Sequence, residues 1–455
     1  YDSFIDQLSG LDLSGLSIRP APFHATDFPC EDAIEQILAA VWSDLFAMFS
    51  DTALEADAEV RVIVARPEIR RALAIVRELE TGVERELIVL TEIPAPPFEE
   101  AARAARYVEL LAGAGLDDVA VDEVGNVLAR RPGSGDGETV AIVAHLDTVF
   151  PPGTDVTVRR DGDRLYAPGI GDNTRGLILL LNVARALARA DVRTVADILF
   201  VGSVGEEGLG DLRGTRHLLR AAGPRVDQFI AIDGGSDSRV VNQALGSRRY
   251  RVTLTGSGGH SWGDFGLANP AHTLGRAIFY FDEAAAEVVN GGPPTSYNVG
   301  RIGGGTSVNA VPGESWAEVD MRSVDPDQLG RMDDVLRAAV ERAVNEQNRT
   351  RDRGKPLEVD VELIGDRPSG TVDPGTPLVQ RALAVTRFLG LQPQLGAAST
   401  DANLPIAAGI PAVTIGRGGT GGGTHSRGEW WAATDAHVGV QRALLLLVAS
   451  AGLAD

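Results

Sequence analysis

The sequence predicts an α/β protein with a mixed, mainly parallel central sheet and a second, inserted unit of βαββαβ order. Three short, bounded apolar runs predict buried strands at 139–145, 196–203 and 227–233. An amphipathic segment over 175–190 lies between the first two runs, and this alternation of strand and helix is typical of a parallel sheet. Between 245 and 362 the rhythm changes to strands that alternate with two long helical segments, which predicts the insert.

The N-terminal part of the chain carries the weakest pattern. Residues 1–66 mix short apolar patches with polar and proline-containing stretches before they become acidic and alanine-rich. We interpret them as an extension of unknown role with some helix. From Arg66 onward apolar residues recur at helical spacing, until TEIPAPPFEE ends that pattern before a second helix over about 98–115. These helices and the three strands make residues 67–244 the first part of the larger domain.

The insert follows a different order of elements. SRRYRVTLTG alternates as a strand, and helical patterns begin at NPAHTLG and again over 325–349. VNAVPGESWAEVDMRS and LEVDVELIG predict further strands, and we assign residues 245–362 to the insert. A helix near 376–390 and a strand over 410–416 then resume the earlier rhythm, so that residues 363–455 form the second part of the larger domain.

Composition excludes several classes of function. The 455 residues carry a formal net charge of −21, which opposes binding to phosphate backbones and to anionic lipid. Cys30 is the only cysteine, so a metal would have to be held by histidines and carboxylates. Lys355 is the only lysine and lies in a polar stretch, which leaves Schiff-base chemistry without a nucleophile. No run reaches the ~20 apolar residues that a membrane span needs, and no signal-peptide pattern opens the chain. We expect no nucleic-acid partner, no membrane association and a cytoplasmic location.

Histidines and acidic residues gather at the ends of the predicted strands. They occur in five short runs: AHLDT (144–148), GIGDN (169–173), GEEG (205–208), AIDGG (231–235) and GTHSRGEW (423–430). Because open α/β sheets bind ligands at the carboxyl edge of their strands, we expect these side chains to share one crevice. Two imidazoles and three carboxylates suit a pair of divalent ions. We expect Zn²⁺, with Co²⁺ or Mn²⁺ as alternatives.

In this order and at these spacings, the five runs resemble the M20 family of metallopeptidases, which includes peptidase T, glutamate carboxypeptidases, succinyl-diaminopimelate desuccinylases and aminoacylases. The resemblance covers roughly residues 70–455. It implies a zinc-exopeptidase-type catalytic domain and makes the insert a ferredoxin-like lid and dimerisation domain. It also implies a homodimer.

The resemblance assigns the metal ligands residue by residue. His145 and Asp233 resemble the ligands of one ion, and Asp172 resembles the carboxylate that bridges both ions. Glu207 and His425 resemble the remaining ligands of the second ion. In such a site the two ions lie ~3.5–4 Å apart and activate a water molecule.

Two further residues beside the ligands receive roles. Glu206 resembles the general base of the family. Neighbouring side chains on a loop point in different directions, so Glu207 can coordinate while Glu206 faces the water. Asp147, two residues after His145, is expected to accept the other N–H of that imidazole and so to fix its tautomer. Asp401, in STDAN, resembles a position that supports the active site, and we give it no ligand role.

The insert supplies three more candidates by the same resemblance. His260, in TGSGGHSW, would stabilise the tetrahedral oxyanion, from the same subunit or from the partner; a polar residue after a tight glycine turn is the alternative. Asn309 and Arg322 match the lid pattern of the family. A guanidinium at position 322 is suited to hold a substrate carboxylate by two hydrogen bonds, and an exposed arginine at a strand end is the alternative.

These residues predict a two-zinc hydrolase that cleaves a peptide or amide bond of a small peptide. An exopeptidase, either a di- or tripeptidase or an aminopeptidase, is the leading hypothesis. The alternatives are an amidohydrolase that deacylates N-acyl amino acids and a metal-binding protein without catalysis. Presence of Glu206 argues against the last of these.

Overall fold

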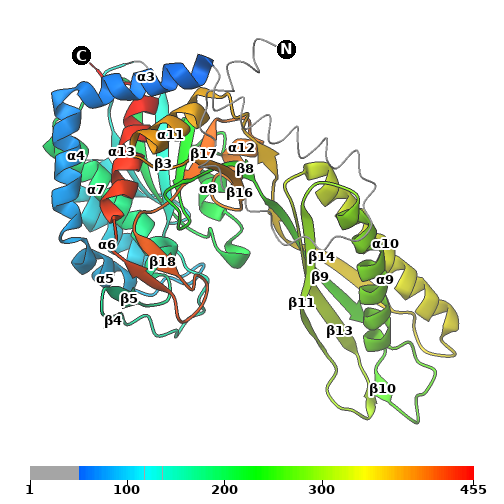
Figure 1. The fold of residues 1–455 in the computed structure, drawn as a ribbon. Coiled ribbons are helices and arrows are strands. Elements are labelled where there is room, and N and C mark those ends of the chain that lie inside the picture. The colour runs from blue at the N-terminus through cyan, green and yellow to red at the C-terminus, as the bar shows by residue number, and fades with distance from the viewer. Residues whose placement is uncertain (1–50, 117, 136, 455) are drawn as a thin grey trace, which may run out of the picture. The chain divides into compact units, whose positions relative to one another are not determined.

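A mixed nine-stranded sheet forms the centre of the larger domain, with the order β1-β2-β6-β3-β7-β17-β8-β15 and with β16 paired to β8 (Figure 1). The strands are β1 Asp118–Val121, β2 Val127–Arg131, β3 Thr139–His145, β6 Asp197–Ser203, β7 Gln228–Ile232, β8 Arg239–Ala244, β15 Gly370–Thr371, β16 Gln394–Ala398 and β17 Ala412–Ile415. This computed structural model describes residues 51–116, 118–135 and 137–454. Residues 1–50 of the predicted N-terminal extension lie outside the described residues. Among the described helices, none is long and apolar enough to span a membrane.

The four central strands β6, β3, β7 and β17 are parallel, as predicted. Every residue of β3 and β6 is buried, because helices cover both faces of the sheet and leave no face for polar residues. Parallel strands end at the same edge, so the residues that follow β3, β6 and β7 come together there.

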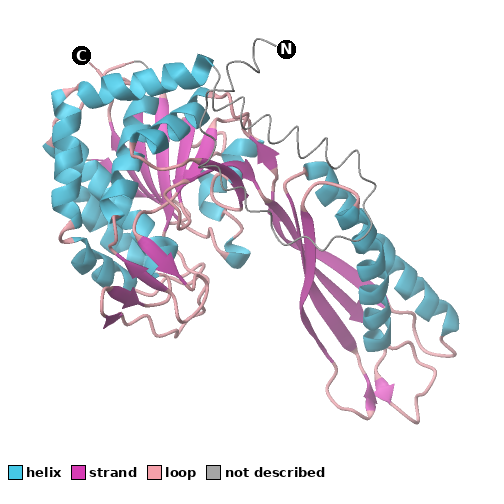
Figure 2. Cartoon of the chain, viewed as in Figure 1, coloured by secondary structure: helices cyan, strands magenta, loops and turns pink. Residues whose placement is uncertain are grey.

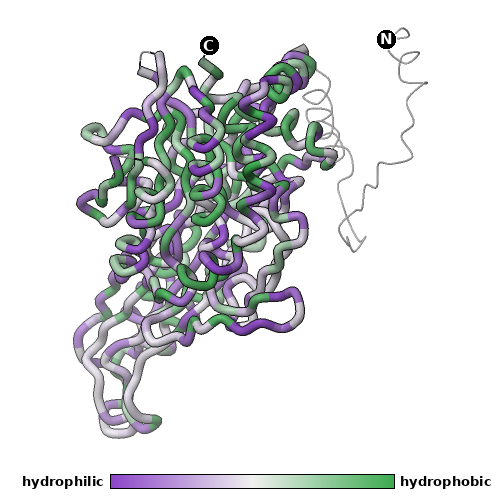
Figure 3. The backbone as a smooth tube through the Cα atoms, turned by 90° about the vertical axis from the view of Figure 1, so that its left-hand side faces the viewer, coloured by the Kyte–Doolittle hydropathy of each residue, from purple (hydrophilic) through white to green (hydrophobic). Residues whose placement is uncertain are grey.

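Helices pack on the two faces of the sheet (Figure 2). They are α3 Asp51–Ala65, α4 Pro67–Glu80, α5 Val83–Thr91, α6 Ala101–Ala112, α7 Gly176–Arg189, α8 Arg213–Leu218, α11 Pro377–Phe388, α12 Asn403–Ala407 and α13 Ala436–Ala451. The apolar pattern after Arg66 is divided between two helices, since α4 ends before Gly82 and α5 begins after it. Helix α3 contributes Ala56, Val60 and Ile63 to the core of the larger domain. In Figure 3 the most hydrophobic parts of the chain run through the middle of this domain.

The insert is a ferredoxin-like unit whose four antiparallel strands have the order β11-β13-β9-β14. Its elements are β9 Gly246–Thr255, α9 Pro270–Asn290, β11 Thr295–Gly304, β13 Glu314–Ser323, α10 Pro326–Thr350 and β14 Glu358–Arg367. The two helices pack on one face of this sheet and share a separate apolar core with it. Strand β11 was not predicted from the sequence, because its residues are half-buried or exposed and form no apolar run. We call this unit the lid; its exact boundaries, like those of the larger domain, stay a prediction.

Two small sheets complete the described fold. In the lid, β10 Gly259–His260 pairs with β12 Ala310–Val311. Beside the central sheet, β4 Arg159–Asp161, β5 Arg164–Tyr166, β18 Thr420–Gly422 and β19 Trp430–Ala432 form a four-stranded sheet. The loop between β18 and β19 carries the predicted ligand His425.

Candidate metal centre and active site

The structure brings the five predicted ligands together at the carboxyl edge of the central sheet. His145 ends β3, Glu207 follows β6 and Asp233 follows β7. Asp172 lies in the turn before α7, and His425 reaches in from its loop with a left-handed φ of 63°. Ligand atoms within 4.8 Å of one another form three groups: His145, Asp172 and Asp233; Asp172, Glu207 and His425; and His145, Glu206 and Glu207.

The carboxylate of Asp172 lies at the centre of this cluster. Its Oδ1 lies 3.2 Å from Nε2 of His145, and its Oδ2 lies 3.2 Å from Nε2 of His425. Nε2 of His425 also lies 3.0 Å from Oε1 of Glu207. One carboxylate thus faces a histidine with each of its oxygens, which is the arrangement that a ligand shared by two ions requires.

The pKa values of the clustered groups are consistent with a site that binds cations. Burial lowers the pKa of His145, but its hydrogen bond to Asp172 and the charge of Glu206 outweigh burial and raise that pKa well above its usual value. Hydrogen bonds to Asp172 and then to a second carboxylate raise the pKa of His425 to about 10. Burial, with the nearby charge of Asp172, raises the pKa of Asp233 to about 7. Beside burial, these raised pKa values reflect the negative charge gathered in the cluster, which bound divalent ions would balance, so the residues fit a divalent-metal centre.

Asp147 is buried beside His145, but its contacts differ from the prediction in one respect. Nδ1 of His145 lies 2.9 Å from the backbone oxygen of Asp147, whereas the nearer carboxylate oxygen is 3.7 Å away. The carboxylate instead accepts hydrogen bonds from the backbone N–H groups of Glu206 and Glu207, at 3.0 and 2.8 Å. A carbonyl therefore orients the imidazole, and the carboxylate fixes the loop that carries the two glutamates.

Glu429 supports Asp172 and was not singled out from the sequence. It is 1% exposed and accepts three backbone hydrogen bonds, from Gly169 at 2.9 Å, Gly171 at 2.9 Å and Asp172 at 2.8 Å. It belongs to the run GTHSRGEW, but its role depends on β19 lying next to the turn before α7. Only the fold reveals that neighbour.

Asp401 is also buried, and both of its carboxylate oxygens are occupied. They accept hydrogen bonds from the hydroxyls of Ser203 and Thr215, each at 2.6 Å. This pattern agrees with a supporting role, and Asp401 belongs to none of the three ligand groups.

A cavity of about 700 Å³ opens over the cluster. Its lining includes the acidic and histidine residues Asp172, Glu206, Glu207, Asp233 and His425, and also the arginines at 239, 249, 322 and 367. The sequence analysis named only Arg322 among these arginines. The others lie far apart in the chain in no recognisable motif, so no local signal could have grouped them.

Arg322 lies on the lid side of this cavity. Its Nε donates to one oxygen of Asp320 at 2.7 Å, and Nε of Arg249 donates to the other oxygen at 2.9 Å. Arg249 also donates to the backbone oxygen of Gly208, at 2.6 Å, next to the predicted ligand Glu207. Two guanidinium groups therefore share one carboxylate at the edge of the cavity.

His260 and Asn309 do not line the cavity. They lie on or beside the small ribbon of β10 and β12, at the end of the lid away from β8 and β16 (Figure 1). His260 is exposed, and its Nδ1 accepts from the backbone N–H groups of Trp262 and Gly263, each at 3.2 Å. Within this chain the structure does not bring these two residues to the ligand cluster.

The sequence profile of peptidase family M20/M25/M40 matches residues 141–449, and the chain belongs to this family. Acetylornithine deacetylase from Myxococcus xanthus is 29% identical over 321 residues, which are 66% of this chain and 80% of that protein. Carboxypeptidase G2 from Pseudomonas sp. is 25% identical over 303 residues, 63% of this chain and 68% of that one.

Solved structures show the same fold. Aminopeptidase PepT from Bacillus cereus superposes with a TM-score of 0.64 at 20% identity, over 82% of this chain and 99% of that one. The di-peptidase Dug1p from Saccharomyces cerevisiae gives a TM-score of 0.67 at 15% identity, over 84% and 98%. These matches confirm the predicted fold class, the family profile confirms the resemblance, and together they make the protein a hydrolase of the peptidase and amidohydrolase type.

Proposed function

We propose that this member of peptidase family M20/M25/M40 is a two-metal exopeptidase that cleaves a terminal residue from a small peptide. The observation that supports it most is the position of Asp172, with one carboxylate oxygen toward His145 and the other toward His425. Asp233 and Glu207 complete one ligand group on either side. Two ions that share Asp172 fit this arrangement better than one ion held by His145, Glu206 and Glu207, because that ion would use Glu206 as a ligand.

Histidine nitrogen and carboxylate oxygen are ligands that suit zinc, and we propose Zn²⁺ as the metal. His145 and Asp233 would hold one ion, Glu207 and His425 the other, and Asp172 both. When bound, such a pair polarises the scissile carbonyl and lowers the pKa of water.

Glu206 carries the proton transfer in this proposal. Burial raises its pKa well above the usual value, although the charge of Arg367 opposes the shift. A raised pKa makes the carboxylate a stronger base toward the proton of an attacking water. The same carboxyl group then returns that proton to the nitrogen of the leaving amine.

Arg322 would orient the substrate by its terminal carboxylate. Its Nε is occupied by Asp320, so the guanidinium is fixed in direction while both Nη groups remain without a hydrogen bond in the described part of the chain. A fork held in this way can form two parallel bonds to a carboxylate. This feature favours an exopeptidase over an enzyme that cuts within long chains.

We also propose a homodimer in which His260 and Asn309 act at the active site of the partner subunit. Neither residue lines the cavity of its own subunit, which argues against action within one chain and in favour of action across the dimer. A histidine that donates a hydrogen bond to the tetrahedral oxyanion would complete the site.

Deacylation of N-acyl amino acids is the second candidate, favoured by the similarity to acetylornithine deacetylase. A panel of di- and tripeptides and N-acetyl amino acids, tested with metal-loaded protein, separates the two. We expect peptides to be cleaved, the activity to disappear with a chelator and Zn²⁺ to restore it. Turnover of N-acetyl amino acids alone would establish the deacylase, and turnover that survives complete metal removal would reject both.

A further inference from the structure

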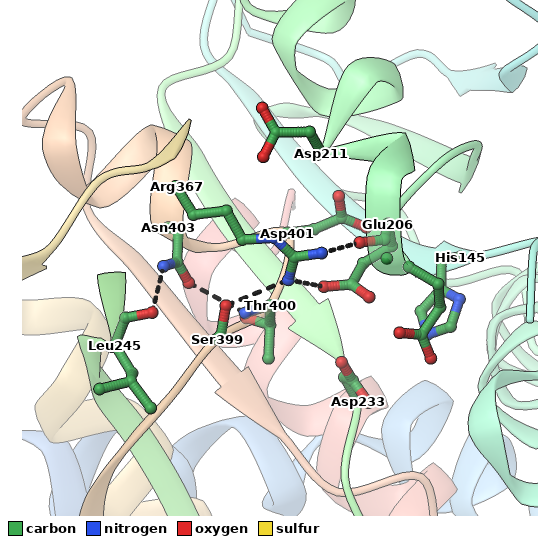
Figure 4. A network of polar contacts seen from close by, with 12 residues as sticks. His145, Glu206, Asp211, Asp233, Leu245, Arg367, Ser399, Thr400, Asp401 and Asn403 are labelled. Carbon is green, nitrogen blue, oxygen red and sulfur yellow. Dashed lines mark hydrogen bonds and ion pairs between the residues drawn. The ribbon is translucent and has the colours of Figure 1, made fainter. Parts of the chain in front are cut away.

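Arg367 is a buried arginine in the active-site cavity to which no sequence motif assigns a role. It is the last residue of β14, and its side chain is 4% exposed. Nη1 donates to Oε1 of Glu206 at 3.0 Å and to Oγ of Ser399 at 3.1 Å, and Nη2 donates to the backbone oxygen of Glu206 (Figure 4). One guanidinium therefore holds both the side chain and the backbone of the proposed general base.

The backbone around Arg367 is fixed on both sides. The N–H of Asp366 donates to Oδ1 of Asp211 at 3.0 Å, on the loop that continues from Glu206. On the other side, Asn403 donates to the backbone oxygen of Leu245 at 2.9 Å (Figure 4). It also donates to the backbone oxygen of Pro368 at 3.0 Å, so it ties together the two points where the chain leaves and re-enters the larger domain. A side chain whose backbone is anchored in this way is preorganised and can set the position of what it binds.

Glu206 needs such a partner. Its carboxylate is 5% exposed and lies beside Glu207 and His145. A buried carboxylate without a hydrogen-bonding cation is strongly unfavourable, and among the described residues Arg367 is the arginine that contacts it. Because Arg367 takes Oε1, the other oxygen, Oε2, is the one left to meet a water molecule.

We propose that Arg367 is the positioning residue of Glu206: its guanidinium holds Oε1 and the backbone of the glutamate so that Oε2 faces the reacting water. The inference rests on the proposed function of Glu206 as the general base. A direct grip on the substrate is disfavoured, because both Nη groups of Arg367 are already engaged within the chain.

The ion pair itself can be tested without activity, in protein stripped of metal. Arg367→Met should lower the melting temperature, and adding Glu206→Gln should restore part of the loss, because the unpaired buried charge is then gone. The control is Arg442→Met, which removes an arginine buried in α13 that contacts Thr386 and Arg239. There the added Glu206→Gln should restore less, because the partner of Glu206 is still in place. If it restores no more beside Arg367→Met than beside Arg442→Met, the pair does not hold Glu206 and the proposal is wrong.

The kinetic test uses the metal-loaded enzyme and a cleaved peptide. Arg367→Met should lower kcat by about 10²-fold, the loss expected when a reacting group is misplaced by ~1 Å, with KM and metal content little changed. Arg367→Lys keeps the charge and should recover part of kcat. In the Glu206→Gln protein, Arg367→Met should cost little more, since both changes remove the same function.

A rise in KM with kcat unchanged, or losses that multiply in the double variant, would overturn the proposal, because Arg367 would then act on the substrate. If the wild-type protein cleaves no peptide, the proposed function fails by itself. The melting temperatures still decide whether Arg367 holds Glu206.

Discussion

Glu429 offers a test of how the fold supports the metal centre. Glu429→Gln keeps the size of the side chain but replaces one carboxylate oxygen with an NH₂ group. The oxygen that remains can still accept from Gly171 and Asp172, whereas the NH₂ would face the N–H of Gly169. Two donors cannot bond, so one buried N–H loses its partner and the other two bonds lose their charge.

The cost can be estimated from these contacts. An unsatisfied buried donor costs about 1–3 kcal/mol, and replacing a charged acceptor by a neutral one weakens each remaining bond by about 1 kcal/mol. Burial raises the pKa of Glu429 above its usual value despite these hydrogen bonds, so release of the buried charge offsets the weakening of the two remaining bonds. The unsatisfied donor is left, and we expect Glu429→Gln to lower the free energy of unfolding by about 1–3 kcal/mol. Because the same bonds hold the backbone of Asp172, metal affinity should fall by about 10–100-fold.

Two assays check this prediction. Urea unfolding in the presence of a chelator gives the stability of the metal-free protein, and competition with a chromophoric chelator gives the metal affinity. Glu109→Gln is the control, since Glu109 is an exposed partner of Arg106 on α6. Wild-type metal affinity in Glu429→Gln, with a stability change no larger than the control's, would refute the view that Glu429 organises the Asp172 turn.

Four further outcomes are expected. Glu206→Gln should retain its metal while kcat falls by ~10²–10⁴-fold, whereas Glu207→Ala should lose metal; equal metal loss by elemental analysis would show that the two roles are wrongly assigned. Arg322→Lys should impair peptides with a free C-terminal carboxylate far more than their amides, and equal losses in kcat/KM would leave Arg322 a support of the lid. Light scattering should give the mass of a dimer, and an active monomer would remove the need for His260 from a partner. Burial would raise the pKa of Asp320, but bonds from two arginines outweigh it and lower that pKa. The stability that ionised Asp320 contributes is therefore present above its pKa in the unfolded chain and is lost as the pH falls below about 4. Asp320→Asn should make unfolding, followed by circular dichroism, less sensitive to acid in this range.

Much of the larger domain could be predicted because its pattern is local. The strands at β3 and β6 are continuous apolar runs that only a sheet covered on both faces can bury, so their type and parallel order follow from the sequence. The ligand candidates share that origin, since residues that directly follow parallel strands meet at one edge. Strand β11 was missed for the opposite reason: it lies at the edge of the lid sheet, with both faces partly open.

The supporting roles of Arg367 and Glu429 could not be predicted, because each acts on a neighbour that is distant in the chain. Arg367 meets Glu206 across 161 residues, and Glu429 meets Asp172 across 257. Arg367 lies in none of the quoted runs, and in GTHSRGEW nothing marks Glu429 as buried, so each is equally compatible with an exposed surface. Asp147 is an intermediate case: its burial beside His145 follows from the strand, but which of its oxygens orients the imidazole depends on the loop of Glu206.

The sequence by itself determined the family, the α/β class and the identity of the side chains that cluster at the sheet edge, because strand periodicity and short motifs are properties of adjacent residues. The tertiary structure alone decided which oxygen of Asp172 faces which histidine and which arginines line the cavity. It also decided that Arg367 pairs with the buried carboxylate of Glu206. These depend on distances between segments brought together by the burial of apolar surface, which constrains the chain as a whole and leaves no local mark. His260 illustrates the division: its motif is plain in the sequence, yet only the fold separates it from the cluster of its own chain.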